Sequence, residues 1–387
     1  MQLRILPHLS IGVALLTGLG CAGAPAEGPD VMRTDSAGVR IVSSGAEDRE
    51  LPWRFDSVGV LTDSAGEPYL FTAMTRRRVL VDRAGRTYVL TPDPAFLRFD
   101  REGRFDRTIG RRGQGPGEFE FPFTVGAQGD TLVVKDGSKR ALVRFSSSLD
   151  PVADRRLEGA LARAGFIEFR SGGLWFSQQL VTDSLRGIEL RADTVGGAPL
   201  HRLIASPGKP VRFGCIGMPS ATPIFEPTIH WAASGPRIVV NEQPDYALWM
   251  YEGGRLIAIV RRPLAPRVPT ADDVRALYPD GFVIRFGGAR PDCEVPADEL
   301  VAKQGLAAAL PLVNDVQYFS DGMIWAQRSL ESGKTGVFDV FGSDGAYLGT
   351  VRGMQMPVAR FPNGDLLVPR EDAETGGIVL TRLRVKR

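Results

Sequence analysis

A glycine-dense stretch carries the side chains best placed to do chemistry. Residues 110–122 read GRRGQGPGEFEFP. Four glycines that tolerate positive φ, and a proline that fixes one φ angle, predict a tight, ordered corner between two sheets. Arg111, Arg112 and Glu118 on such a corner could bind an anionic ligand. The competing interpretation, a structural turn with solvated charges, is the one the sequence favours.

The same stretch also has the glycine content of a phosphate-binding loop. No GK[ST] follows it and no strand–loop–helix pattern surrounds it, so nucleotide binding is not favoured. Phe119 and Phe121 alternate like the first residues of a new strand. We expect Pro122 to end that strand, because proline cannot donate to a sheet ladder.

Other charged clusters give weaker signals. The arginine run at residues 76–78 could line a mouth or bind anionic glycans, but a solvated basic run is favoured. Four acidic residues could supply oxygen ligands but lack EF-hand spacing: Asp292, Glu294, Asp298 and Glu299. His230 beside Trp231 is interpreted as a buried aromatic corner. No GxSxG, HExxH or CxxC motif occurs, so the sequence nominates no catalytic residue, no metal site and no cofactor.

The overall charge excludes one large class of partner. The chain has 387 residues with a formal net charge of +2, so no basic field for nucleic acid is implied. Forty-three per cent hydrophobic residues are ordinary for a globular protein, and 45 glycines with 28 prolines indicate many turns.

The N-terminus has the features of a targeting segment. Arg4 precedes an apolar run over residues 5–19, which is too short to span a membrane. The sequence GLGC at residues 18–21 resembles a bacterial lipobox, which would lipidate Cys21. The alternative is ordinary cleavage after Ala24 or Ala26. We therefore expect a signal peptide at 1–20, a tether at 21–34, and an extracytoplasmic protein, either a lipid-anchored envelope protein or a periplasmic or secreted one.

An oxidising compartment permits disulfides. With Cys21 lipidated, Cys215 and Cys293 remain, and an even pair suggests one bridge between them. The alternative is two unrelated small core residues.

An internal repeat organises the rest of the chain. A Gly-containing turn followed by a β-rich strand recurs six times, with the marker glycines 44, 43, 63, 87 and 42 residues apart. Three of these spacings fit a four-stranded propeller blade of roughly 40–45 residues. Period-2 alternation between turns indicates all-β structure. The marker glycines are Gly85, Gly129, Gly172, Gly235, Gly322 and Gly364.

The pattern therefore predicts a six-bladed β-propeller of four-stranded antiparallel blades over residues 35–387. Strands near residues 35–45 and 54–61 precede the first blade, and one of them could complete the last blade and close the ring.

The two long spacings predict insertions. One, near 206–227, reads as a long ordered loop; the other, near 269–312, contains two helical runs, at 271–277 and 296–309. We expect both insertions to share one face, where a Cys215–Cys293 bridge would fix them as a lid over one mouth of the ring. The ligand face is then predicted to be the face carrying the lid.

The assembled stretches resemble the bacterial six-bladed β-propeller lipoproteins related to NHL-repeat proteins. The similarity rests on GRRGQGPGEFEFP at 110–122, DSAGVRIV at 35–42, and the repeats VLVDRAGRTYVL at 79–90 and LRFDREGRF at 97–105. In that family the Gly-Pro-Gly-Glu-Phe segment links blades. The resemblance covers most of the mature chain and implies a fold rather than a function. The helical insertion departs from a bare NHL-like blade.

The sequence thus favours a monomeric binding or scaffold module that recognises a protein, peptide or glycan over one face of the ring. The alternative is a metal-dependent lactonase- or lyase-like enzyme with acidic residues in the central channel.

Overall fold

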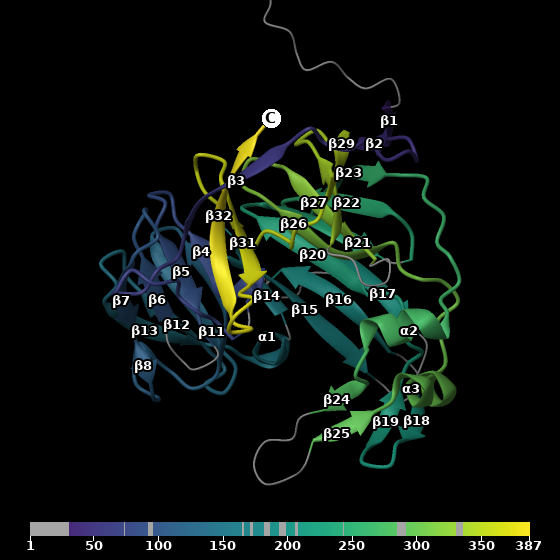
Figure 1. Ribbon diagram of the computed structural model, residues 1–387, viewed down its shortest axis with the longest axis horizontal. Coiled ribbons are helices and arrows are strands. Elements are labelled where there is room, and N and C mark those ends of the chain that lie inside the picture. The colour runs from purple at the N-terminus through teal and green to yellow at the C-terminus, as the bar shows by residue number, and fades with distance from the viewer. Residues whose placement is uncertain are drawn as a thin grey trace, which may run out of the picture.

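The computed structural model describes residues 31–387 apart from 73, 92–95, 165, 171–172, 182–185, 193–198, 206–207, 243, 285–291 and 330–335. Six four-stranded antiparallel units surround a common centre, with their first strands innermost (Figure 1). The fold is a six-bladed β-propeller, as the repeat predicts. The predicted signal peptide, the tether up to residue 30, Cys21 and Gly172 lie outside the described residues.

The first three blades follow the chain without interruption. Blade 1 contains β4 (Val79–Val81), β5 (Thr87–Leu90), β6 (Phe96–Phe99) and β7 (Phe105–Ile109). Blade 2 contains β10 (Pro122–Gln128), β11 (Thr131–Asp136), β12 (Ala141–Phe145) and β13 (Pro151–Arg156). Blade 3 contains β14 (Phe166–Arg170), β15 (Gly173–Val181), β16 (Arg186–Ala192) and β17 (His201–Ala205).

The last three blades carry the additions. Blade 4 contains β20 (Ile229–Ser234), β21 (Arg237–Glu242), β22 (Ala247–Glu252) and β23 (Arg255–Arg261). Blade 5 contains β26 (Val313–Tyr318), β27 (Ile324–Arg328), β28 (Val337–Phe341) and β29 (Tyr347–Arg352). Blade 6 contains β30 (Ala359–Arg360), β31 (Leu366–Glu371), β32 (Ile378–Lys386) and, from the other end of the chain, β3 (Arg54–Val60).

The core lies between neighbouring blades, which explains the unusual burial of the middle strands. All four residues of β5 are buried. Alternate side chains point to opposite faces of the blade, and a neighbouring blade covers each face. Tyr88 and Leu90 pack with Val134 and Phe145 of blade 2, whereas Val89 packs with Leu367 of blade 6. Such strands read as continuous apolar runs rather than clean alternation.

The two ends of the chain close the ring. β3 pairs antiparallel with the C-terminal strand β32, from Arg54 opposite Lys386 to Val60 opposite Thr381. This confirms the prediction that an N-terminal strand completes the last blade. The earlier strands β1 (Met32–Ser36) and β2 (Val39–Ser43) form a hairpin that extends blade 4, where β2 runs parallel to β23.

Strand order divides the ring into two faces. Within each blade the first and third turns lie on one face, which we call the hairpin face. The middle turn and the blade-to-blade connections lie on the other, which we call the linker face. The corner at residues 110–121, both insertions and the one-turn 3-10 helix η1 (Arg76–Arg78) therefore belong to the linker face.

The two insertions fold together into a small module. It contains the hairpin β18 (Lys209–Arg212) and β19 (Gly217–Ala221), helix α2 (Ala271–Leu277), the pair β24 (Phe282–Ile284) and β25 (Cys293–Val295), and helix α3 (Ala297–Gln304). The expected loop near 206–227 is thus a hairpin. The second helix is shorter than predicted because Gly305 ends it at φ 82°. A short helix between blades 2 and 3, α1 (Gly159–Arg163), was not expected.

The expected disulfide ties the module together. Cys215 and Cys293 are bridged, with their Cα atoms 5.5 Å apart. Cys293 is buried with Phe213, Val295 and Leu300 in a core that belongs to the module alone. At a sequence separation of 78 residues, the chain-entropy model assigns such a bridge roughly 4.5 kcal/mol of stabilisation.

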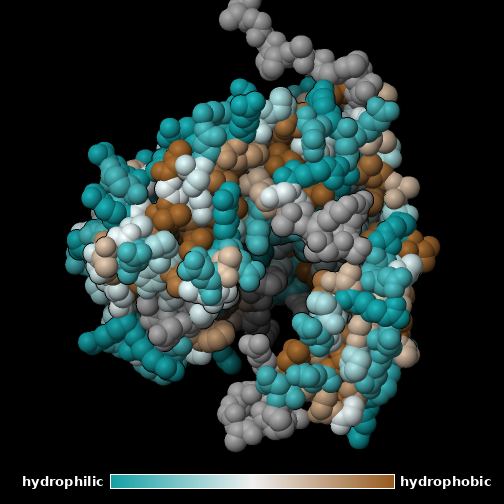
Figure 2. Space-filling view, in the orientation of Figure 1, coloured by the Kyte–Doolittle hydropathy of each residue, from teal (hydrophilic) through white to brown (hydrophobic). Residues whose placement is uncertain are grey.

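The module does not form the lid that the sequence suggested. In Figure 1 it lies at the rim beyond β17, away from the innermost strands, and Figure 2 shows a hollow between it and the blades on the left. Each insertion follows the fourth strand of its blade, β17 or β23, rather than the innermost strand. Among the described residues, no helix is long and apolar enough to cross a membrane.

Candidate ligand-binding site

The predicted corner is a closed structural joint. β8 (Arg111–Arg112) pairs parallel with β9 (Glu118–Phe119). The Gly115 N–H donates to Glu118 Oε2 at 2.8 Å and Arg111 Nε donates to Oε1 at 2.7 Å. These two bonds, the backbone one first, hold the pKa of the Glu118 carboxyl below its usual range. Arg112 is exposed.

A lysine from blade 2 fastens the same joint. Lys139 Nζ donates to the carbonyls of Gly115 and Glu118 at 2.9 and 3.0 Å and pairs with Asp154 at 2.6 Å. Because both oxygens of Glu118 and the nearby carbonyls already have donors, the corner fits the structural-turn interpretation.

Two details of the corner differ from expectation. Pro122 begins the inner strand β10 rather than ending a strand. Proline is tolerated there, because the first residue of an edge strand does not have to donate an N–H to a neighbouring strand. Gly110, Gly113 and Gly117 have positive φ, but Gly115 does not. At Gly117 (φ 73°) a Cβ would also lie 2.7 Å from Pro151 Cγ, so glycine is required there on two grounds.

The arginine run at residues 76–78 is partly buried rather than solvated, contrary to the favoured interpretation. The side chain of Arg76 is only 7% exposed and enters the ring centre. It pairs with Asp315 of blade 5 at 2.6 Å, lies 3.6 Å from Glu168 of blade 3, and donates to the Trp231 carbonyl of blade 4 at 2.5 Å. It also donates to the Val316 carbonyl. One guanidinium group thus joins the entry of blade 1 to three other blades.

Burial sets the protonation behaviour of this centre. Desolvation opposes charging Arg76, but Asp315 and then Glu168 outweigh it and raise its pKa. Burial also raises the pKa of Glu168 against the pull of Arg76 and Arg77. Burial, with repulsion from Arg76, lowers the pKa of Arg77 to about 10.

His230 belongs to the same environment. Burial lowers its pKa to about 4, and Arg76 adds to that effect while Asp315 opposes it. The neighbouring Trp231 is buried, in keeping with the aromatic corner expected from sequence. Arg77 lies 5.8 Å from the Trp231 ring centroid.

A cavity of about 290 Å³ is lined by the innermost strands of the blades and by Arg76 and Arg77. Its acidic lining residue, Glu168, faces Arg76. Within the described part of the chain, no three His, Cys, Asp or Glu side chains are grouped to hold a metal ion. The acidic residues of the insertion do not converge either: Asp298 pairs with Arg275 at 2.8 Å and Glu299 with Lys303 at 2.7 Å.

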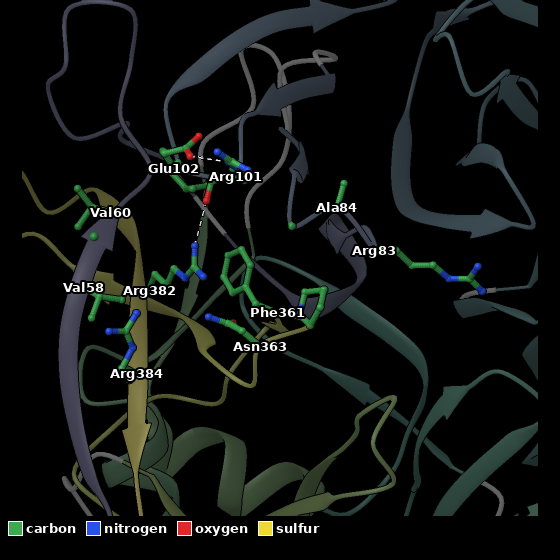
Figure 3. Close-up of a pocket in the computed structure, with 15 residues that line it drawn as sticks. Val58, Val60, Arg83, Ala84, Arg101, Glu102, Phe361, Asn363, Arg382 and Arg384 are labelled. Carbon is green, nitrogen blue, oxygen red and sulfur yellow. Dashed lines mark hydrogen bonds and ion pairs between the residues drawn. The ribbon is translucent and has the colours of Figure 1, made fainter.

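A larger cavity of about 510 Å³ lies where the ring closes, between blade 6 and blade 1 (Figure 3). We call it the seam groove. Its walls are three hairpin-face turns, together with β3 and β32. Those turns span residues 82–86, 100–104 and 361–365. It is lined by Val58, Gly59, Val60, Leu61, Arg83, Ala84, Gly85, Arg101, Glu102, Gly103, Phe361, Pro362, Asn363, Arg382 and Arg384.

Local geometry explains how the groove stays open. At the turn of blade 1, Gly103 has φ 90°, and a Cβ there would lie 2.9 Å from the Val60 carbonyl oxygen. The backbone can therefore approach closely, and the Thr62 N–H donates to the Gly103 carbonyl at 2.8 Å. This contact holds the blade-1 turn against the end of β3 at one wall of the groove.

Arginine dominates the groove's charge. Arg382 donates to Asp365 at 2.8 Å and to the Arg101 carbonyl at 3.0 Å, and its guanidinium lies 4.1 Å from the Phe361 ring centroid. Arg384 is 3.6 Å from Asp365. Arg101 pairs with Glu102 at 2.6 Å. Arg83 is exposed on its turn and has no ion pair among the described residues.

Sequence reasoning singled out the arginine run at residues 76–78 but favoured a solvated run, and it missed the seam groove. The groove combines five segments between residues 58 and 384 that share no motif, and only the closure of the ring brings them together. One signal was present: Arg382 and Arg384 alternate on the C-terminal strand, and alternation places both on one face of a sheet.

Comparisons with known proteins define the class. Residues 83–192 match the family model DUF5128, described as a 6-bladed beta-propeller. This covers blade 1 beyond its first strand, blade 2 and most of blade 3. No curated protein matches the sequence.

One solved structure supports the fold, and a second has a lower TM-score. A “putative exported protein” from Bacteroides fragilis is similar with a TM-score of 0.52 at 10% identity, covering 90% of this chain and 100% of that one. A member of the DUF4221 family from Bacteroides vulgatus has a TM-score of 0.45 at 12% identity, covering 88% and 98%. The chain is a six-bladed β-propeller, and at these identities the likeness extends to the fold alone.

Proposed function

We propose that this protein is an extracytoplasmic binding module that engages a protein, peptide or glycan over the hairpin face of its ring. The observation that carries the proposal is the seam groove. It opens among hairpin-face turns, and it presents four arginines beside apolar side chains.

This assignment reverses the face that the sequence suggested. The insertions leave from the linker face and fold into a module at the rim, whereas the groove is walled by hairpin turns. Loops held on a rigid scaffold are the usual place for recognition. The ligand face is therefore proposed to be the one opposite the blade connections.

The compartment follows from three mutually consistent features. The N-terminal segment reads as a signal peptide, the fold contains a disulfide, and disulfides persist mainly outside the cytoplasm. The similar Bacteroides fragilis protein is described as exported. Lipid anchoring through Cys21 is the finer form of this proposal and rests on the lipobox-like GLGC at residues 18–21.

The enzyme alternative has less support. It required acidic side chains free to hold a metal in the channel, but Glu168 and Asp315 both face Arg76 there. Among the described residues at the ring centre, these two carboxylates are paired with the Arg76 guanidinium.

Site-specific photo-crosslinking tests the proposed face. A photoreactive amino acid at Ala84 or Ser343, on two hairpin-face turns, should give adducts with a ligand in intact cells. The same residue at Glu374, on a linker-face turn, should not. Adducts from Glu374 alone, or from none of the three positions, would contradict the proposal.

Cell fractionation tests the anchor separately. Cys21→Ser should move the protein from the membrane fraction to the soluble fraction, because the lipid would be lost. A substituted protein that stays with the membrane, together with a wild-type protein of unlipidated mass, would rule out the lipobox.

A further inference from the structure

We infer that the seam groove binds an extended acidic peptide segment that carries an apolar side chain beside its carboxylates. This deepens the proposed binding role and rests on it. Three features of the groove carry the inference: its charge, its exposed apolar strand edge and its lack of an open aromatic face.

The charge of the groove favours an anionic partner. Four arginines line it, Glu102 in the lining pairs with Arg101, and Asp365 contacts Arg382 and Arg384. Over these six residues, four positive and two negative charges leave a net charge of +2. Arg83 lies on the blade-1 turn and Arg384 on β32, and the Arg83 side chain extends away from the other lining side chains (Figure 3). An extended segment that runs along the groove and over the blade-1 turn could place carboxylates against both, and arginine forms paired hydrogen bonds with carboxylates.

The apolar part of the groove comes from an edge strand. β3 is the outermost strand of blade 6 and pairs only with β32. A bulge between Ser57 and Gly59 leaves Val58 outside the regular ladder with 41% of its surface exposed. Exposed apolar side chains on sheet edges are normally avoided, since they invite pairing with another chain. Here the edge lies inside a basic groove, so it selects for a chain of opposite charge.

An extended peptide fits these features better than a glycan does. Sugar rings are commonly bound against open aromatic faces, but the one aromatic side chain in the lining, Phe361, has the Arg382 guanidinium over its ring at 4.1 Å. Val58, Val60 and Pro362 instead offer aliphatic surface. Peptides recognised at sheet edges gain affinity from main-chain contacts and specificity from alternate side chains. The bulge limits such pairing to a few residues, so the arginines supply most of the selectivity.

Fluorescence anisotropy on the full mature chain tests the inference. The probe is a labelled octapeptide, EEVEEVEE, compared with QQVQQVQQ and EEGEEGEE. Polygalacturonate serves as an anionic glycan competitor. The groove variant is the double substitution Arg83→Gln with Arg384→Gln, and Val58→Ser tests the apolar contact. Arg112→Gln, an exposed arginine on the linker face, is the matched control.

We expect the wild type to prefer EEVEEVEE to both other peptides. The groove variant should bind it about tenfold more weakly, because two contacts of about 0.7 kcal/mol each are lost. Val58→Ser should remove the preference over EEGEEGEE, and Arg112→Gln should bind like the wild type. Equal affinity for the glutamine peptide, unchanged binding by the groove variant, or tighter binding of polygalacturonate would each overturn the inference. Crosslinking from Ala84 or Ser343 would still support the hairpin face in those cases, so the two proposals can fail separately.

Discussion

Arginines at the ring centre and arginines at the seam groove have opposite environments. Arg76 is buried among Asp315, Glu168 and two carbonyls from three blades. In the seam groove, Arg83 is exposed. The side chain of Arg384 is 54% exposed, and its Nε lies 3.6 Å from a carboxylate oxygen of Asp365. A buried charge must be matched by partners or it destabilises the fold, whereas an exposed one costs little and remains available to a ligand.

This difference in burial and pairing distinguishes arginines that stabilise the fold from arginines that are available to a ligand. At the centre, both carboxylates that could have served a metal or a reaction are held against a guanidinium from the chain itself. At the seam, positive charge exceeds negative charge, and apolar surface lies beside it. Arginine content alone therefore does not locate a binding site in this ring; the burial and pairing of each guanidinium do.

The largest expected effect comes from removing the central guanidinium. Arg76→Ala should lower the free energy of unfolding by about 3–5 kcal/mol, because it leaves the desolvated Glu168 carboxylate and the partly exposed Asp315 without their cation. Chemical denaturation measures this, with Arg112→Ala as an exposed control expected to change less than about 0.5 kcal/mol. An Arg76→Ala protein as stable as that control would break the distinction between the two clusters.

The burial of His230 at the ring centre should make the free energy of unfolding depend on pH. His230 has a pKa of about 4 in the fold against roughly 6.5 when unfolded. The unfolded chain therefore binds the proton first, and stability is lost as pH falls from 6.5 towards 4, by at most about 3 kcal/mol. Glu168 works in the opposite direction, since its pKa is raised. Denaturation at several pH values should show a shallower acid loss in His230→Asn; an identical pH dependence would mean that His230 is not desolvated.

The corner at residues 110–122 contains an exposed arginine, Arg112, whose removal can be compared with the loss of a strained glycine nearby. Gly117→Val should destabilise the fold by about 1–3 kcal/mol, because valine would be strained at φ 73° and would meet Pro151. The removal of exposed Arg112 at the same corner should not. An unchanged melting midpoint in Gly117→Val would show that this joint can relax.

The sequence predicted the features that depend on local repetition. The closing strand, the paired cysteines and the marker turns follow from spacing and count. The described structure contains the strand, the disulfide and five of the six turns, and the turn at Gly172 lies outside the described residues. The run at residues 76–78 could not be assigned, because burial of Arg76 depends on where the connection from blade 6 enters the ring. The same limit applies to the seam groove, which joins Val58 to Arg83 and Arg384 only after the ring has closed.

The most direct test of the central claim is a thermal melt of the double variant Arg83→Gln with Arg384→Gln, with and without EEVEEVEE. Exposed arginines that serve recognition should leave the midpoint without peptide at the wild-type value. The wild type should rise with peptide, because a ligand that binds only the folded state stabilises it by mass action, and the variant should not. A variant that melts lower without peptide, or that rises as much as the wild type with it, would contradict the assignment of these arginines to ligand binding.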